Sequence, residues 1–331
     1  MPASAPRGSS FLRDGPLYST SVTTQPDSHE PLPEPQPAQL IRTLSSAGGI
    51  SVRSLIGSNL IAHAMSLRDF SPTAADALGR TLMGTVLIAV GSAARSSEDP
   101  GENVQVQIRG DGPLGSLVAI SDSDGRVRGT VSEPNFDLRL GDGTPDVARA
   151  IGLGTLTVLR HRPGWGEPHS GSVPLTSGEV AEDLTLYLSE SEQIPSAMGL
   201  GVAMAEDRTA VVGAGFLVQI LPGAEDSEIA QAEANVKALP PLSELVLSGM
   251  DGHDLLDRLL EGLGGRKRHQ SDALFYCPCD GERALGALSL LERSTLEEII
   301  RQEETEEVCC HFCGQRYTFG PSQIATLLPR T

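Results

Sequence analysis

Five cysteines carry the most specific chemistry in this 331-residue sequence, and all of them lie near its C-terminal end. Cys277-Pro-Cys279 places two thiols one residue apart, and Cys310-His-Phe-Cys313 places two more across a two-residue spacer. Zinc takes four soft ligands in a tetrahedron, each sulfur at about 2.3 Å, and two facing turns can supply them as pairs. The spacing therefore predicts one zinc ion in the chain, held by Cys277, Cys279, Cys310 and Cys313.

Other uses of these side chains stay open on spacing alone. The pairs could be reactive dithiols, or buried cysteines that act only as small hydrophobic side chains. Cys309 directly precedes Cys310 and would bracket a three-residue spacer with Cys313, and His311 offers a nitrogen donor within reach. We prefer Cys310 as the ligand because a two-residue spacer gives the usual turn geometry. Cys309 and His311 are then bystanders.

The segment from Cys277 to Thr331 has a composition that needs such a site. It is short and includes the acidic run "EEIIRQEETEEV", so it holds too few apolar residues to fold comfortably alone. In small zinc modules the apparent metal-binding free energy, roughly 10 to 16 kcal/mol near neutral pH, is in effect the folding free energy. We therefore predict that loss of zinc unfolds this segment.

The long segment before the cysteines predicts a domain of mixed helices and strands. "SPTAADALGRTLMGTVLIAVGSAAR", from Ser71, has a capping serine, a proline for the first turn and apolar residues at helical spacing, which predicts a long buried helix. After Pro100 the apolar residues alternate and glycine-containing turns follow, so strands are expected. Further strands are predicted at 155–160, 199–205 and 216–221, with a helix between residues 177 and 192.

The expected fold class is α+β, with a large N-terminal α+β domain, a helical linker and a small C-terminal zinc-binding module. Pro222-Gly223 ends the large domain, and apolar stripes broken by prolines and glycines then indicate short helices. We place the core domain at 39–223, the linker at 224–270 and the zinc module at 271–331.

The first 38 residues form a fourth predicted region. They hold eight of the 23 prolines and few apolar residues, which is typical of a disordered tail. An organelle transit peptide is the alternative, because Arg7 and Arg13 lie in a start that contains little acid.

Charge and missing motifs narrow the function classes. A net charge of -18 disfavours nucleic acid as a partner, because that binding depends on lysine and arginine at phosphates. No run approaches the roughly 18 apolar residues of a membrane span, and no secretory signal is visible, so we expect a cytoplasmic protein with reduced thiols and no membrane partner. The sequence contains no G-x-S-x-G elbow, phosphate loop or H-E-x-x-H motif, so we expect no enzyme.

Several stretches resemble the redox-regulated 33 kDa chaperonin family, heat-shock protein 33. The C-x-C and C-x-x-C pairs with "YTF" after them resemble that family, as do "QIRGDGPLG" from Gln107, "VRG" from Val127, "YLSESEQIPS" from Tyr187 and "GFLVQILPGA" from Gly215. The similarity covers about residues 40–325. The proline-rich tail, "GAGF" at 213–216 and the additional Cys309 depart from the family pattern.

The resemblance implies an ATP-independent holdase chaperone that binds unfolding proteins under oxidative stress. It implies that Cys277, Cys279, Cys310 and Cys313 hold zinc as thiolates in the reduced, inactive form. It further implies redox-active disulfides Cys277–Cys279 and Cys310–Cys313 in the oxidised, active form, which we expect to be a homodimer. Capture of Cys310 or Cys313 by Cys309 would change that pairing.

Two other functions stay in view. The alternative is a constitutive protein-interaction module with a structural zinc site. A thiol oxidoreductase is the third possibility, although that use of C-x-x-C places the attacking sulfur at a helix start in a βαβ setting.

Overall fold

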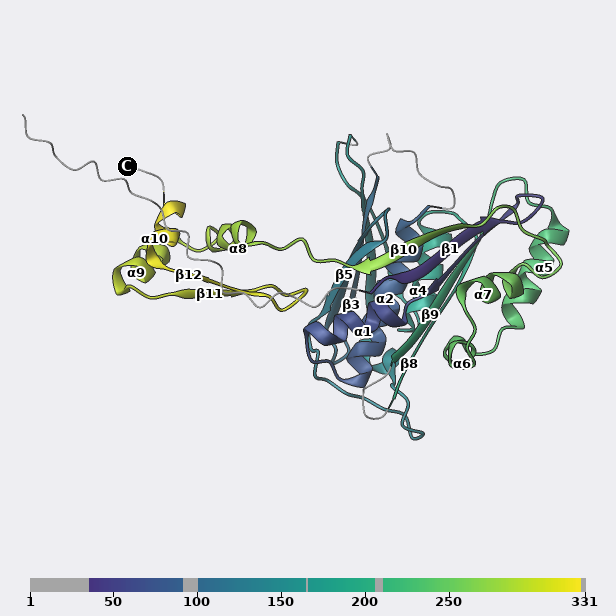
Figure 1. Cartoon of the computed structure of the whole chain (residues 1–331), viewed down its shortest axis with the longest axis horizontal. Coiled ribbons are helices and arrows are strands. Elements are labelled where there is room, and N and C mark those ends of the chain that lie inside the picture. The colour runs from purple at the N-terminus through teal and green to yellow at the C-terminus, as the bar shows by residue number, and fades with distance from the viewer. Residues whose placement is uncertain (1–35, 92–100, 165, 206–210, 329–331) are drawn as a thin grey trace, which may run out of the picture. The chain divides into compact units, whose positions relative to one another are not determined.

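The computed structural model describes residues 36–91, 101–164, 166–205 and 211–328 (Figure 1). Most of the predicted proline-rich tail and the end of the segment predicted as the long helix lie outside these ranges. Within them the architecture is mixed α and β, with a large N-terminal sheet domain and a C-terminal cysteine cluster. The α+β fold class is therefore confirmed.

A ten-stranded sheet organises the large domain. Its order is β7-β6-β3-β4-β5-β10-β1-β2-β9-β8, and every neighbouring pair is antiparallel except β10 with β5. β10 therefore joins a first group of five strands to a second group of four (Figure 1). The strands are β1 (Ala38–Leu44), β2 (Ile50–Ile56), β3 (Asn103–Gly110), β4 (Ser116–Asp122), β5 (Arg126–Val131), β6 (Gly154–His161), β7 (His169–Leu175), β8 (Ser196–Met204), β9 (Val211–Ile220) and β10 (His269–Phe275).

The buried helix α2 (Pro72–Ala89) holds the two groups of strands together. Ser71 caps it, with its Oγ accepting a hydrogen bond from the Ala74 amide at 3.1 Å, and Pro72 occupies the first turn. The helix packs against β3, β4 and β5 on one side and against β2, β8 and β9 on the other. Its side chains form the centre of the main core, beside α1 (Ser58–Leu67), α3 (Val147–Ile151) and α4 (Val180–Glu190).

Three short helices follow the last strand of the second group: α5 (Asp226–Lys237), α6 (Leu242–Leu247) and α7 (Gly252–Leu259). Asp251 begins α7 with a capping box, accepting from the Asp254 amide at 3.0 Å. Apolar side chains of these helices pack with those of β1, β2 and β9 in a second core. The predicted linker was 224–270, and because β10 begins at His269 we use the name linker below for residues 224–268.

The C-terminal module contains α8 (Gly281–Leu288), α9 (Arg293–Gln302), the hairpin of β11 (Glu306–Cys309) and β12 (Arg316–Phe319), and α10 (Pro321–Ile324) followed by a 3-10 turn at Ala325–Leu327. Its own apolar core is small. The buried members are Ala284, Leu288, Leu296, Ile299, Tyr317, Phe319 and Ile324. Burial on this scale is marginal for independent folding.

The predicted helix from Ser71, the later strands, the helix at 177–192 and the linker helices are confirmed. β1, β2, β7 and β10 were not predicted. The four-part division at 38, 223 and 270 stays a prediction, and β10 spans the last of these boundaries. None of the described helices is both long and apolar enough to cross a membrane.

Candidate metal centre

Four cysteine sulfurs converge at the start of the C-terminal module. One Sγ atom from each of Cys277, Cys279, Cys310 and Cys313 lies within 4.8 Å of the other three. The Cys277–Cys310 and Cys279–Cys313 sulfurs are 3.6 and 3.4 Å apart. Sulfurs at about 2.3 Å from a common tetrahedral centre lie about 3.8 Å from one another, so the set fits a zinc-sized ion. The cluster could hold a metal ion, and its all-sulfur donor set is consistent with zinc.

The first sulfur pair lies between β10 and α8. Cys277 follows the last residue of β10 by two positions, and Asp280 caps α8 directly after Cys279. The Asp280 Oδ1 accepts from the Arg283 amide at 2.8 Å, and the Arg283 guanidinium donates to the Pro278 carbonyl. The Asp280 cap and the Arg283 side chain together hold the turn that contains Cys277 and Cys279.

The second pair is carried by the connection of the β11–β12 hairpin. The Cys310 amide donates to the Gln315 carbonyl at 2.8 Å, and the Gly314 amide donates back to the Cys310 carbonyl at 2.8 Å. Gly314 has φ +76°, a conformation that glycine adopts without the Cβ clash of other residues. The turn brings Cys310 and Cys313 to the same sulfur cluster, where Cys313 is 1% exposed.

Cys309 and His311 lie outside the four-sulfur cluster. Cys309 is the last residue of β11 and is exposed, with its Sγ near the Gly314 carbonyl at 3.5 Å. Successive side chains in a strand point to opposite faces, so Cys309 faces away when Cys310 faces the cluster. His311 is exposed. The assignment of the four ligands and of their disulfide pairing stays a prediction.

Residues that spacing could not identify surround the cluster. The Tyr317 hydroxyl lies 3.2 Å from the Cys279 sulfur and donates to it. The Arg68 guanidinium donates to the His311 carbonyl, and the Arg128 guanidinium lies over the Phe312 ring at 4.9 Å. Arg68 and Arg128 belong to the large domain, so the hairpin turn is held by both parts of the chain. Tyr317 follows the C-x-x-C pair closely, but nothing in its position in the sequence marks it as a sulfur partner.

Hydrogen bonds within the cluster move the pKa values of three thiols, Cys277, Cys310 and Cys313, in different directions. Hydrogen bonds from the Cys277 and Cys313 thiols lower the pKa of Cys310. The same pairing with Cys310 raises the pKa of Cys277 to about 12, and the hydrogen bonds of Cys313 with Cys277 and Cys310, together with burial, raise the pKa of Cys313. Of these three thiols, Cys310 is therefore favoured to ionise first, ahead of Cys277 and Cys313.

Zinc affinity is expected to increase steeply with pH. All four ligands bind as thiolates, so Cys277 and Cys313, whose pKa values are raised, must each release a proton when metal binds. Binding should therefore weaken by at least about a hundredfold for each unit that the pH falls. Competition with a chromophoric chelator between pH 6 and pH 8 measures this slope. An affinity that stays constant across that range would contradict the proton assignment.

Tyr317→Phe is expected to weaken zinc binding about 10- to 100-fold, the usual effect of losing a partner that orients a ligand. The aromatic ring remains in the module core, so the module should still fold with saturating zinc. Chelator competition provides the measurement. Tyr276→Phe, which removes a hydroxyl from an exposed ring beside the same turn, is the matched control and should leave the affinity unchanged.

The fold and the sulfur cluster define a protein in which a ten-stranded sheet domain is followed by a small four-cysteine metal module. The sequence model of the family described as "Hsp33 protein" matches residues 38–320. The chain therefore belongs to the Hsp33 family.

Individual relatives agree with this assignment. The chain is 37% identical over 286 residues to the 33 kDa chaperonin of Symbiobacterium thermophilum, covering 86% of this chain and 95% of that protein. It is 41% identical to that of Lacticaseibacillus casei, covering 77% and 85%. The crystal structure of the 33 kDa chaperonin (Heat shock protein 33 homolog) from Thermotoga maritima matches with a TM-score of 0.78 and 32% identity, over 88% of this chain and 97% of that one. The family and these names support a chaperone, and the relatives are named as chaperonins rather than as enzymes.

Proposed function

We propose that the chain is a redox-regulated, ATP-independent holdase that binds unfolding proteins and prevents their aggregation under oxidative stress. The reduced form, with zinc on four thiolates, is inactive, and the oxidised form, with two disulfides, is active. The protein acts in the cytoplasm on unfolded or partly folded clients, as a homodimer when oxidised, and without nucleic acid or membrane partners.

The observation that carries the proposal is the continuity of the chain from the linker through β10 to Cys277. Linker side chains cover apolar side chains of the sheet, among them Ile41, Val52 and Phe216. The chain then enters β10, and the sulfur cluster begins two residues after β10 ends. A change of structure at the cluster therefore acts on the segment that covers apolar surface, the kind of surface that binds unfolded chains.

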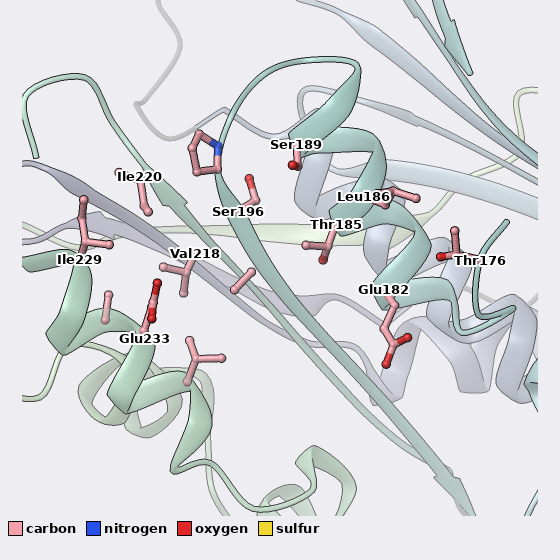
Figure 2. A pocket seen from close by; sticks show the side chains of 14 residues that line it. Thr176, Glu182, Thr185, Leu186, Ser189, Ser196, Val218, Ile220, Ile229 and Glu233 are labelled. Atoms are coloured by element: carbon pink, nitrogen blue, oxygen red, sulfur yellow. The ribbon is translucent and has the colours of Figure 1, made fainter. Parts of the chain in front are cut away.

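The cover formed by the linker is incomplete, which favours its displacement. A cavity of about 490 Å³ lies between α5 and the core domain (Figure 2). Apolar side chains line it from three elements: Ile229 and Val236 of α5, Val218 and Ile220 of β9, and Leu186 of α4. An interface with such a gap lacks dispersion contacts that a filled one would have, so less free energy is needed to open it.

The chemistry of the switch follows from the four thiols. Bound zinc supplies the crosslink that folds the module. Oxidation of two thiols to one disulfide reduces one molecule of hydrogen peroxide to two of water. The first thiol becomes a sulfenic acid and releases one water, and the second thiol attacks the sulfenic sulfur and displaces its hydroxyl as the other. Two such steps, pairing Cys277 with Cys279 and Cys310 with Cys313, consume all four ligands. Disulfide exchange with a reduced thiol reverses both.

Loss of the crosslink should unfold the module, because its own core is small. The contacts of Arg68 and Arg128 with the hairpin turn are lost with it, and the linker loosens from the sheet. Apolar surface of the linker and of the sheet then becomes available to clients.

Light scattering of a thermally unfolding client tests the proposal. Peroxide-treated protein is expected to suppress aggregation, and reduced, zinc-loaded protein is expected not to. Equal suppression by both forms would support the constitutive module with a structural zinc site. If neither form suppresses aggregation, the proposed chaperone function is wrong. Zinc release and disulfide mapping by mass spectrometry on the same samples report whether the four thiols reacted.

A further inference from the structure

β10 occupies an unusual place for a segment so close to a metal centre. It lies in the middle of the ten-stranded sheet, antiparallel to β1 and parallel to β5 (Figure 1). Each of its neighbours has another strand on its far side, β2 beside β1 and β4 beside β5. Removal of β10 would therefore create two new strand edges inside the sheet and leave every other pairing intact.

The attachment of β10 is slight on its β5 side. The register there contains two pairs, Leu274 with Arg126 and Phe275 with Val127. The backbone bonds run from the Leu274 amide to the Gly125 carbonyl at 3.0 Å and from the Tyr276 amide to the Val127 carbonyl at 2.8 Å. Both lie within three residues of Cys277, so unfolding at the sulfur cluster reaches them first.

The β1 side is longer but polar. Five pairs run from Ala38 with Ala273 to Arg42 with His269. The first four residues of β10 are His-Gln-Ser-Asp, and its buried side chains are Ala273 and Phe275 at the end nearest the cluster. Ser271 Oγ is buried without a hydrogen-bond partner, which further weakens this strand. The apolar burial that opposes its departure is confined to these two side chains.

The other nine strands of the large domain are also held together without β10. α2 packs against strands of both groups, so it connects them through the main core. The vacated edge of β1 presents apolar side chains on both faces of the sheet, since Leu40 belongs to the main core and Ile41 to the core beneath the linker. Arg128 of β5 stacks on Phe312 while the C-terminal module is folded. When the module unfolds, Arg128 would lose this contact and lie beside the vacated edge of β5.

We infer that the position of β10 between β1 and β5 is a client-binding slot, and that an extended segment of an unfolded protein replaces β10 there by strand addition. The inference rests on the proposed function. Backbone hydrogen bonds to β1 supply sequence-tolerant affinity, and apolar or aromatic side chains of the client take the places of Ala273 and Phe275. In the reduced form β10 itself fills the slot and excludes clients.

An engineered disulfide between β10 and β1, which a reductant can open, tests the slot; we call it the β10 staple. The Leu274 and Tyr276 amides bond to β5, and backbone groups two residues apart in a strand point the same way, so those of Asp272 also point away from β1. Asp272 therefore faces Gln39 of β1 as a pair without mutual hydrogen bonds. Such pairs have Cα atoms about 4.5 Å apart, within the range of a disulfide. Gln39→Cys with Asp272→Cys is made in a full-length parent whose five native cysteines are serine. Loss of the metal ligands should leave this parent open.

The matched control places the same staple far from β10. Thr157 of β6 and Ser172 of β7 are paired, and their hydroxyl oxygens are 2.9 Å apart. Thr157→Cys with Ser172→Cys therefore adds a disulfide to the same sheet without touching β10. Suppression of aggregation is measured with a client that lacks disulfides, with and without dithiothreitol, and hydrogen exchange of the linker is measured in parallel.

The β10 staple is expected to reverse the redox dependence. With dithiothreitol the variant should suppress aggregation as its parent does. With the disulfide formed, the client should aggregate as much as it does alone, while the linker amides still exchange. The control should be active in both states. Full activity of the disulfide form would refute client binding in the slot and leave the proposed function intact. An inactive parent would contradict both the proposed function and client binding in the slot.

Hydrogen exchange on the wild-type chain is the second measurement, and it decides the matter if the parent does not fold. Amides of β1 should lose protection after peroxide treatment and regain it when an unfolded client is added. Unchanged β1 protection after oxidation would refute strand release. Protection that returns without client and increases with protein concentration would assign the slot to β10 of a second copy, which overturns the client assignment.

Discussion

Replacing Cys310 with serine is expected to weaken zinc binding more than about 100-fold, since loss of an outer partner alone costs 10- to 100-fold. The module should then unfold, because its few buried side chains cannot replace the free energy of the metal. The large domain should stay folded, since its core is built around α2. Metal content by mass spectrometry and hydrogen exchange across residues 281–328 measure both effects.

Cys309→Ser is the matched control, because it removes a thiol one residue away. Its sulfur is exposed and outside the cluster, so metal content and exchange should match the wild type. A loss of zinc in Cys309→Ser, with zinc retained in Cys310→Ser, would mean that the ligand assignment is wrong. If the proposed function holds, Cys310→Ser should also suppress client aggregation without any oxidant.

Replacing Leu82 with alanine is expected to lower the free energy of unfolding of the large domain by about 2 to 5 kcal/mol. Leu82 is fully buried in α2, and its Cδ2 lies 2.8 Å from the position that a Cβ on Gly129 of β5 would take. The side chain therefore fills the space that this glycine leaves, and its truncation opens a cavity between helix and sheet. Denaturant unfolding of the reduced protein measures the change.

Leu153→Ala is the control for this second substitution, because Leu153 is 62% exposed and its truncation creates no cavity. The change there should stay within about 0.5 kcal/mol. Zinc content should be unaffected by Leu82→Ala, since the sulfur cluster has its own supporting contacts. A destabilisation of Leu153→Ala as large as that of Leu82→Ala would contradict the placement of the core at α2.

Local signals were sufficient to predict the helices that position the rest of the fold. Ser71, Pro72 and the apolar spacing after them specify the start and the buried character of α2, and each acts within one or two turns. The linker helices were predictable for the same reason. Their partners on the sheet were not, because apolar periodicity indicates which face is buried without indicating what covers it.

β10 could not be predicted because its sequence lacks the usual signal. "HQSDALF" begins with four polar residues and shows no regular alternation. The strand is specified by its neighbours, through pairing with β1 and β5, whose residues lie far away in the chain. Strand formation of this kind depends on tertiary context rather than on local propensity.

The cysteine cluster was predictable in composition but not in its surroundings. Spacing favoured Cys310 over Cys309, and the hairpin gives the physical reason, since alternation along β11 turns the two thiols to opposite faces. Tyr317, Arg68 and Arg128 contact the turn residues or their sulfurs through folding of distant segments. No pattern within one stretch of sequence contains that information.

The central position of β10 also has a consequence for biosynthesis. Thr43, at the end of β1, bonds to the Arg266 carbonyl, 223 residues away, just before β10 begins. A ribosome releases the other nine strands of the sheet first, and contacts of such long sequence separation form late. Each newly made molecule is therefore expected to leave the facing edges of β1 and β5 unpaired until residues 269–275 emerge from the ribosome, when β10 of the same chain can occupy them.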